Sequence, residues 1–343
     1  MRKGLGIVAA IAMIGAAGAA HGQSFPNLRY QAGPVELSAR LAASVQGAVF
    51  DDPDGPSDSP EGDFDASARL NAEWVFANGW VLGGRFEIDT DDRAVEDLQR
   101  DEIYGYFVTE YGRLELGEQD GPADVLAFHA PIVGLGQIRG DFVRYAGSQA
   151  LLSPFDTRDS FKVIYLSPPI FGLRGGVSYS PEFKSNADDP NPRARTIQND
   201  AIELGLQYQR PVGNWILGVS GSYVTADADP ITERADLDSW SVGLQFRRNK
   251  LIIAGSYVDR GDSNRLSDFD QWEVNAGVSW RDDRWGAGVS AAIQDTEISE
   301  NRLVGLGGYF DITRWFTVRA DVVYIDEDIG DGVVALGELA VAF

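Results

Sequence analysis

Three arginines stand in three consecutive stretches in which apolar and polar residues alternate: Arg40, Arg69 and Arg85. A later stretch of about forty residues supplies a set of carboxylates, namely Asp120, Asp124, Asp141, Asp156 and Asp159. Opposite charges that face each other across a narrow water-filled passage create a transverse field, which orients polar solutes and hinders apolar ones. We therefore expect these residues to form the charged constriction of a pore.

Two alternatives to this arrangement stay open. The arginines could instead neutralise neighbouring glutamates on the same wall, of which the candidates are Glu36, Glu73 and Glu87. Arginines in the later stretch could also cancel its acids locally, and these are Arg139, Arg144 and Arg158. Residue types alone do not fix the pairing.

The sequence offers little for catalysis. It has no cysteine, which excludes a thiol nucleophile and a cysteine metal site. Beyond residue 22 the single histidine is His129, which lies in the long charged stretch and not on a strand beside an acid–base partner. No Gly-x-Ser-x-Gly motif or zinc-ligand pattern appears. We predict that the protein is not an enzyme.

The overall charge and the acid clusters limit which partners the protein can have. The net charge of −23 and the isoelectric point near 4.4 repel phosphate backbones, so nucleic-acid binding is not expected. No cofactor is predicted. Acid clusters could bind loop Ca²⁺, although a solvated loop is the simpler interpretation, and these clusters comprise Asp227, Asp229, Asp326, Glu327 and Asp328.

The N-terminus has the pattern of a secretory signal peptide. Arg2 and Lys3 precede an apolar run from Gly4 to Ala20, and small residues follow, which predicts cleavage before Gln23. We therefore expect a signal peptide at 1–22 and a single mature domain at 23–343, whose net charge is −25 without the two leading cations. A retained N-terminal anchor is the alternative.

Alternation of apolar and polar residues continues through the mature chain. One face of the first such stretch carries Val35, Leu37, Ala39 and Leu41, and the other carries polar residues. The pattern predicts sixteen strands, at 35–49, 64–76, 80–88, 102–111, 113–119, 160–168, 172–180, 200–209, 215–225, 239–247, 251–260, 271–281, 285–294, 302–312, 316–326 and 333–343. Short connections such as Asn78-Gly79 alternate with long acidic ones, which is typical of an antiparallel transmembrane β-barrel.

Aromatic residues fall at both ends of these strands. Trp74, Trp80 and Tyr111 lie beside short turns, whereas Phe50, Phe64 and a further group lie beside long loops: Phe161, Tyr179, Tyr223, Trp240, Tyr257, Trp272 and Tyr324. Two aromatic belts are expected of a barrel that crosses a membrane. The alternative is a soluble β-sandwich, in which large aromatic residues would share one interior.

The stretch at 117–159 interrupts the alternation. A connection of this length inside a regular β protein is uncommon unless it is functional or disordered, and this one is too rich in apolar residues for a solvated linker. We predict that it folds into the lumen as a pore loop at about 120–159. A surface Ω-loop is the alternative.

Several segments resemble the general diffusion porins of Gram-negative bacteria, in particular the alphaproteobacterial, Rhodobacter-type branch. The matching segments are IYGYF at 103–107, YGRLELG at 111–117, DGPAD at 120–124, VIYLSP at 163–168, Phe171-Gly172 and the terminal Phe343. The resemblance covers the whole mature chain. It implies an all-β fold, namely a 16-stranded antiparallel transmembrane β-barrel in the bacterial outer membrane with a long third loop folded into the lumen.

The resemblance also implies partners. It implies a homotrimer in outer-membrane lipid and a barrel-assembly machinery that recognises the last strand, with Phe343 as the assembly signal. Small residues on the early and late strands predict the flat face through which copies pack, and these are Ala39, Ala43, Ala66, Ala68, Ala72, Ala335 and Gly337.

The expected function is a water-filled channel for passive diffusion of ions and small hydrophilic solutes. Because acids are concentrated in the long loops, we expect the channel to be cation-selective. Three alternatives remain: a barrel adhesin or receptor with a closed lumen, a barrel hydrolase, and an anion-selective, phosphate-type porin.

Overall fold

The computed structural model describes residues 28–51, 61–90, 98–145, 149–155, 157, 160–184, 197–228, 235–263, 270–296, 299–328 and 330–343. Seventeen strands occur in these ranges, and each is antiparallel to the strands with which it pairs. The first nine are β1 (Leu28–Ala32), β2 (Val35–Asp51), β3 (Glu61–Val75), β4 (Val81–Thr90), β5 (Leu98–Thr109), β6 (Gly112–Glu118), β7 (Phe161–Leu166), β8 (Leu173–Lys184) and β9 (Ile197–Val212). The others are β10 (Trp215–Ala228), β11 (Leu237–Arg248), β12 (Leu251–Gly261), β13 (Gln271–Arg281), β14 (Trp285–Asp295), β15 (Glu300–Asp311), β16 (Phe316–Glu327) and β17 (Gly330–Ala342).

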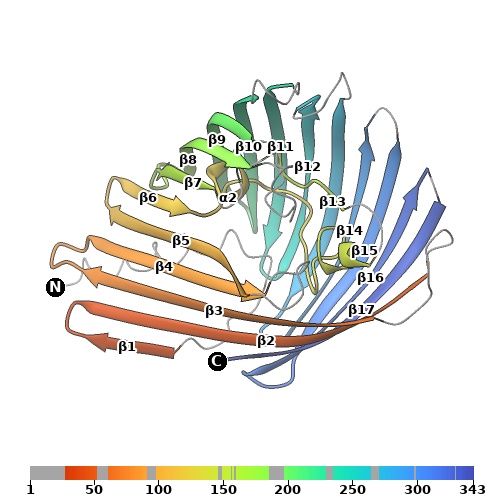
Figure 1. Ribbon diagram of the computed structural model, residues 1–343, viewed down its shortest axis with the longest axis horizontal. Coiled ribbons are helices and arrows are strands. Elements are labelled where there is room, and N and C mark those ends of the chain that lie inside the picture. The colour runs from red at the N-terminus through yellow and green to blue at the C-terminus, as the bar shows by residue number, and fades with distance from the viewer. Residues whose placement is uncertain are drawn as a thin grey trace.

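Strands β2 to β17 form a closed wall (Figure 1). Each strand pairs with its neighbour in sequence, and β17 returns to pair with β2, with Ala335 opposite Val49 and Val341 opposite Ala43. Closure leaves no free edge along the wall. The predicted sixteen-stranded antiparallel barrel is therefore confirmed, and the alternative of a two-sheet sandwich is wrong.

Strand β1 was not expected from the sequence. A turn at Gly33-Pro34, in which Gly33 has a φ of 60°, connects it to β2, and the two strands pair antiparallel with Leu28 opposite Ala39. The same edge of β2 pairs with β17 further along, and Phe343 exchanges two backbone hydrogen bonds with Leu41 at 2.8 and 3.0 Å between these two partners. β1 therefore continues the wall beyond the C-terminus. Its single short run of alternating residues was too brief to predict a strand.

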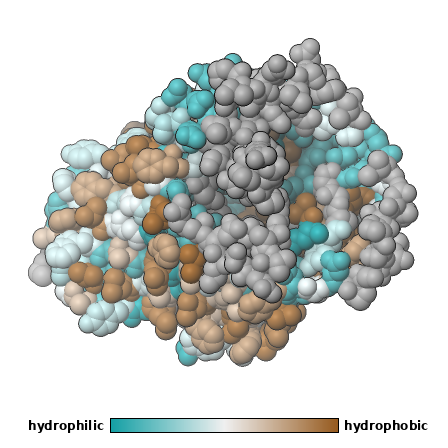
Figure 2. Space-filling view, in the orientation of Figure 1, coloured by the Kyte–Doolittle hydropathy of each residue, from teal (hydrophilic) through white to brown (hydrophobic). Residues whose placement is uncertain are grey.

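The two faces of the wall are the reverse of those of a soluble protein. The large apolar side chains that alternate along the strands are exposed on the outside, as Leu37, Leu70, Leu82 and Val242 are. Figure 2 shows hydrophobic residues gathered on the outer surface over the strands labelled β1–β5 in Figure 1. Such an outer surface needs an apolar medium or a partner to cover it.

The aromatic residues follow the predicted belts with one exception. Trp74 and Tyr111 near short turns, and Phe64, Tyr179 and Trp240 near long loops, are all exposed on the outside. Phe50, which the sequence placed with the second group, instead points inward and is 8% exposed, with its ring centroid 6.2 Å from that of Tyr145. The exception arises because this part of the interior is apolar.

The described part of the chain between β6 and β7 lies against the inner side of the wall. It includes α2 (Pro122–Val125) and the 3-10 helix η2 (Asp141–Arg144). Neither of the helices in the described ranges is long and apolar enough to cross a bilayer. Figure 1 shows this segment inside the curve of the strands. We call residues 119–160 the inner segment.

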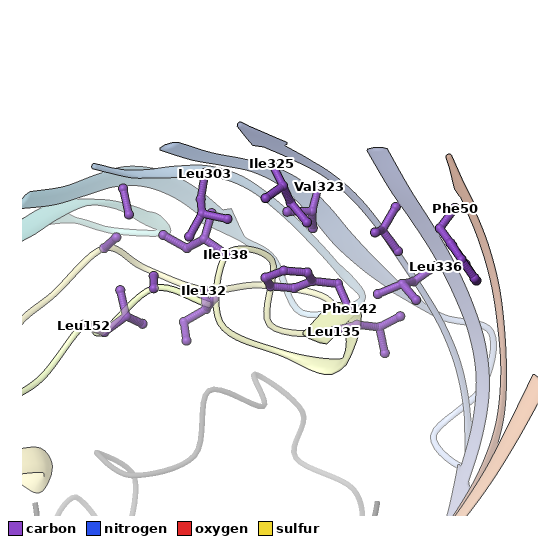
Figure 3. Close-up of a cluster of buried hydrophobic side chains, with 14 of the residues drawn as sticks. Phe50, Ile132, Leu135, Ile138, Phe142, Leu152, Leu303, Val323, Ile325 and Leu336 are labelled. Atoms are coloured by element: carbon purple, nitrogen blue, oxygen red, sulfur yellow. The ribbon is translucent and has the colours of Figure 1, made fainter. Parts of the chain in front are cut away.

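A hydrophobic cluster fills the space between the inner segment and the wall (Figure 3). From the inner segment it takes Ile132, Leu135, Ile138, Phe142 and Leu152, and from inward positions on β2 and β14–β17 it takes Ala48, Phe50, Ala292, Leu303, Val323, Ile325, Val334 and Leu336. Ile138, Phe142 and Leu303 are fully buried. Each large apolar side chain buried in this way contributes about 1.5–3 kcal/mol, so the segment is bound by a core of its own.

The candidate pore and its relatives

The predicted arginines all lie on the inner side of the wall, on β2, β3 and β4. Arg40 is directly opposite Arg69, and Arg69 is opposite Glu87. The guanidinium group of Arg69 donates two hydrogen bonds to the Glu87 carboxylate, one of them from Nη2 to Oε1 at 2.8 Å. Two parallel bonds of this kind fix the orientation of both side chains.

Two other inward arginines, Arg85 on β4 and Arg319 on β16, also have acidic partners. Arg85 donates to Glu102 Oε2 at 3.1 Å and to Asn71 Oδ1 at 3.1 Å, and Arg319 lies 3.2 Å from Glu338. The neutralisation that the sequence left open is therefore present for Arg69 and Arg85, although the partner of Arg85 was not among the three glutamates considered. A paired guanidinium group presents less positive potential to the lumen than an isolated one.

The predicted acids are spread along the inner segment. Asp120 and Asp124 lie at the start of α2, near β9 and β10, whereas Asp141 begins η2 and accepts a hydrogen bond from Gln46 Nε2 on β2 at 2.6 Å. Of the three predicted acids that the structure describes, Asp141 is the one that contacts the strand that carries Arg40. Asp156 and Asp159 lie outside the described residues.

The arginines of the inner segment have structural partners. Arg139 donates from Nη1 to the carbonyl oxygens of Ala150, at 3.0 Å, and Leu151, so it joins the outgoing and returning arms of the segment. Arg144 pairs with two carboxylates of β3, Asp63 and Asp65, the latter at 3.3 Å. Arg158 lies outside the described residues. The turn of the segment is thereby joined to β3.

Three buried carboxylates on the wall receive backbone N–H groups of the inner segment, and their role was missed by sequence reasoning. Glu203 on β9 accepts from Ala123 and Thr157, Glu273 on β13 accepts from Leu151 and Leu152, and Asp321 on β16 accepts from Gln137. Their residues are 0%, 0% and 1% exposed, respectively. The sequence did contain a signal for this role, because each carboxylate stands in the middle of a strand on its lumen face, opposite an apolar inner segment.

Other polar groups of the wall continue this attachment. Ser220 Oγ accepts from Phe128 N at 2.8 Å, Asn275 Oδ1 accepts from Ala130 N at 2.8 Å, and Ser290 Oγ donates to Pro131 O at 2.6 Å. Buried backbone groups without such partners would be costly. The inward polar side chains of β10–β14 therefore replace the water that the inner segment displaces.

Metal binding finds no support in the described part of the chain, where no group of three or more histidine, cysteine, aspartate or glutamate side chains has a metal-binding arrangement. Asp229, one of the residues considered for Ca²⁺, lies outside the described ranges.

Comparison with solved structures shows the fold. OmpF of Salmonella typhi, in a complex with daunomycin, superimposes with a TM-score of 0.67 at 12% identity, over 92% of this chain and 100% of that chain. A mutant porin of Rh. blastica gives 0.61 at 13% identity, and an anion-selective porin from Comamonas acidovorans gives 0.62 at 10% identity, each over 90% of this chain and 100% of the other.

The family is shown by the sequence itself. A search of curated proteins found no match. The model of the Gram-negative porin family, however, matches residues 8–330, which is nearly the whole chain. Members of this family are non-enzymatic channel proteins of the outer membrane. With its closed barrel, apolar outer surface and polar inner wall, the chain belongs to the Gram-negative porins and forms an outer-membrane diffusion channel.

Proposed function

We propose that this channel is cation-selective and passes ions and small hydrophilic solutes, with the inner segment as its constriction. The observation that carries the proposal is the pairing of the arginines on the inner faces of β3 and β4, which we call the uncovered wall. Arg69 and Arg85 each have a glutamate partner, so neither provides a free positive charge.

Carboxylates on the same wall exceed these pairs. Glu73 and Asp89 occupy inward positions of β3 and β4 in addition to the partners of Arg69 and Arg85, and Asp63 and Asp65 share the single cation of Arg144. Together with a net charge of −23 for the chain, they favour a negative potential in the lumen. Such a potential enriches cations before they reach the narrowest part of the passage.

The inner segment supports the proposed constriction by its position and its charge. It occupies lumen volume along β9–β17, so solutes pass between it and the wall of β3–β6. Asp124 and Asp141 are both partly exposed on it, and Asp141 lies near the arginines of β2 and β3. We include Asp120, Asp156 and Asp159 in the proposed acidic side, together with Arg40, Arg69 and Arg85 on the opposite side.

Selectivity is measured as the zero-current potential across a KCl gradient in planar bilayers. We expect a cation-selective potential that fades with salt, because the Debye length falls from roughly 10 Å at 0.1 M to roughly 3 Å at 1 M. The double variant Asp124→Asn with Asp141→Asn should weaken the potential. Replacing Arg69 and Arg85 with glutamine should strengthen it, since each change frees a glutamate.

The matched control is Asp283→Asn. It removes one carboxylate at a short turn, where the side chain is 94% exposed, and we expect the potential of the parent. An anion-selective potential at low salt would contradict the proposal and favour an anion or phosphate channel. Absence of any conductance would instead favour a receptor with a closed lumen.

We also propose a homotrimer that packs through the outer faces of β2–β5. The outward positions described on β2, β3 and β4 carry no charge, whereas acids occupy the outer rim of β11–β17, at Asp238, Asp259, Asp295, Glu300, Asp326 and Asp331. An apolar groove of about 840 Å³ crosses the early strands, with Ala39, Ala72, Gly84 and Gly105 among its lining residues. Small residues allow copies to approach closely.

The trimer is tested by crosslinking in mild detergent. We expect Ala72→Arg to give monomers, because it fills the groove with a charge, and Val242→Arg on the far wall to remain trimeric. Both variants place an arginine on an outward face, where it costs up to about 2–4 kcal/mol in lipid, so the pair separates contact from insertion. Equal behaviour of the two would contradict the proposed face.

Residues 1–22 are proposed to be the signal peptide that directs the chain to export, which leaves 23–343 as the mature barrel. The positive charges of Arg2 and Lys3, and the apolar run from Gly4 to Ala20 that follows them, support the proposal. N-terminal sequencing of the outer-membrane form tests it, and a start at Gln23 is expected.

A further inference from the structure

Glu203 and Lys162 form a fully buried pair of opposite charges beneath the inner segment. Glu203 belongs to β9 and Lys162 to β7, and both side chains have 0% exposure. Nζ of Lys162 lies 3.9 Å from Oε1 of Glu203. Charged groups are rarely buried to this extent unless they are paired and hydrogen-bonded.

The Glu203 carboxylate contacts both ends of the inner segment. Its Oε1 accepts from the backbone N–H of Thr157, at 2.7 Å, and from the Thr157 hydroxyl group. Its Oε2 accepts from the backbone N–H of Ala123 at 3.4 Å. One side chain therefore holds the place where the segment leaves β6 and the place where it returns to β7.

The surroundings fit the carboxylate closely. A Cβ atom at Gly121 would overlap the Glu203 carboxylate, and one at Gly205 would overlap the carbonyl group of Pro122. Ser222 Oγ donates to Ala123 O at 2.7 Å. The start of the segment thus lies directly on the backbone of β9, at a distance that only glycine permits.

An apolar cluster closes this site from water. Ala123, Ala201, Val224, Ala226 and Leu237 are buried together, with Phe155 packed against them. Hydrogen bonds to an ionised acceptor are stronger in such surroundings than in water. Burying the two charges is costly, however, and the cost is offset only while both partners and their hydrogen bonds are present.

We infer that Glu203, with Lys162, is the positioning residue that closes the base of the inner segment and thereby sets the aperture of the channel. This inference rests on the proposed constriction. The segment is fixed at its base by charge and along its length by the cluster around Phe142. Loss of the base contact alone leaves the barrel closed but lets both arms of the segment move.

The test compares three variants of the full-length protein. Glu203→Gln keeps the shape but removes the charge that attracts both N–H groups and the counter-charge of the buried Lys162. Glu203→Gln with Lys162→Met removes both charges and relieves that imbalance. Glu115→Gln is the matched control, because Glu115 is a 6% exposed carboxylate on β6 that pairs with Arg113.

Amide hydrogen exchange gives a readout that does not depend on conduction. We expect exchange in peptides covering 119–128 and 151–161 to be at least about tenfold faster in both Glu203 variants than in the parent or Glu115→Gln. Heat stability of the barrel should fall in Glu203→Gln and recover in the double variant. A merely structural role would make exchange recover together with stability.

Aperture is measured as the exclusion limit for neutral sugars of graded size and as single-channel conductance. We expect both Glu203 variants to admit larger sugars than the parent. Their single-channel conductance should differ from that of the parent by about twofold, and the open channel should show more current noise. Unchanged exchange in both variants would overturn the inference, as would faster exchange with an unchanged exclusion limit. A parent that passes no solute would overturn the proposed function, while the exchange comparison would still decide whether Glu203 holds the segment.

Discussion

Replacing Leu303 with aspartate is expected to detach the inner segment from the barrel wall and to enlarge the pore. Leu303 is fully buried on β15, in the cluster that includes Ile138 and Phe142. Losing its apolar side chain costs about 2–5 kcal/mol. Burying an ionised carboxylate in its place costs several kcal/mol more. Detachment of the segment from the wall therefore becomes favourable.

The barrel itself should survive this change. Its strands are held by backbone hydrogen bonds to both neighbours, and the backbone at position 303 stays opposite Ala292 and Ile325 in the ladders. The carboxylate at position 303 would then face water in the lumen, where it is readily solvated. The effect is therefore directed at the inner segment, and the expected result is a higher exclusion limit, higher conductance and proteolytic cleavage within 130–152.

Asn71→Asp is the control for the added charge. Asn71 faces the lumen on the uncovered wall and accepts from Arg85 at 3.1 Å, so a carboxylate there has a partner and meets no part of the hydrophobic cluster. It should alter selectivity without changing the exclusion limit. If Leu303→Asp gave the same exclusion limit and proteolytic pattern as Asn71→Asp, the cluster would not be what holds the segment.

Strand positions were predictable because one physical rule governs all of them. In a closed barrel every strand separates an apolar exterior from a polar interior, so alternation fixes its face, and β2–β17 follow the predicted ranges closely. The rule fails where the interior is also apolar. Val334 and Leu336 point inward between outward neighbours on β17, and Phe50 was assigned to the wrong face for the same reason.

Pairing inside the pore could not be predicted in the same way. The sequence placed Arg85 on the inner wall, but its partner Glu102 lies on β5 within an irregularity in the register between β4 and β5. A shift of one residue changes which side chains face each other. Glu203 was equally hidden, because its contacts with Ala123 and Thr157 depend on how a non-periodic segment folds.

Removing Phe343 is expected to abolish most outer-membrane assembly while costing the finished barrel comparatively little. Its N–H and C=O groups bond to Leu41 across the seam, and its ring lies 5.4 Å from that of Trp315. These contacts are worth about 2–4 kcal/mol together, a modest loss for a barrel of sixteen paired strands.

Recognition of the last strand by a barrel-assembly machinery, which we propose for this chain, would make the loss in cells much larger than that. The comparison that separates the two effects is Trp315→Ala, which removes the ring contact of Phe343 but leaves the terminal residue and its backbone bonds in place. We expect this variant to reach the outer membrane at the level of the parent and to unfold at a slightly lower temperature.

Deletion of Phe343 should instead reduce the yield of heat-modifiable barrel in outer-membrane fractions. The same deletion variant, refolded from urea into detergent micelles, should recover the conductance of the parent. Equal membrane yields for the deletion and Trp315→Ala would mean that Phe343 acts only through packing at the seam.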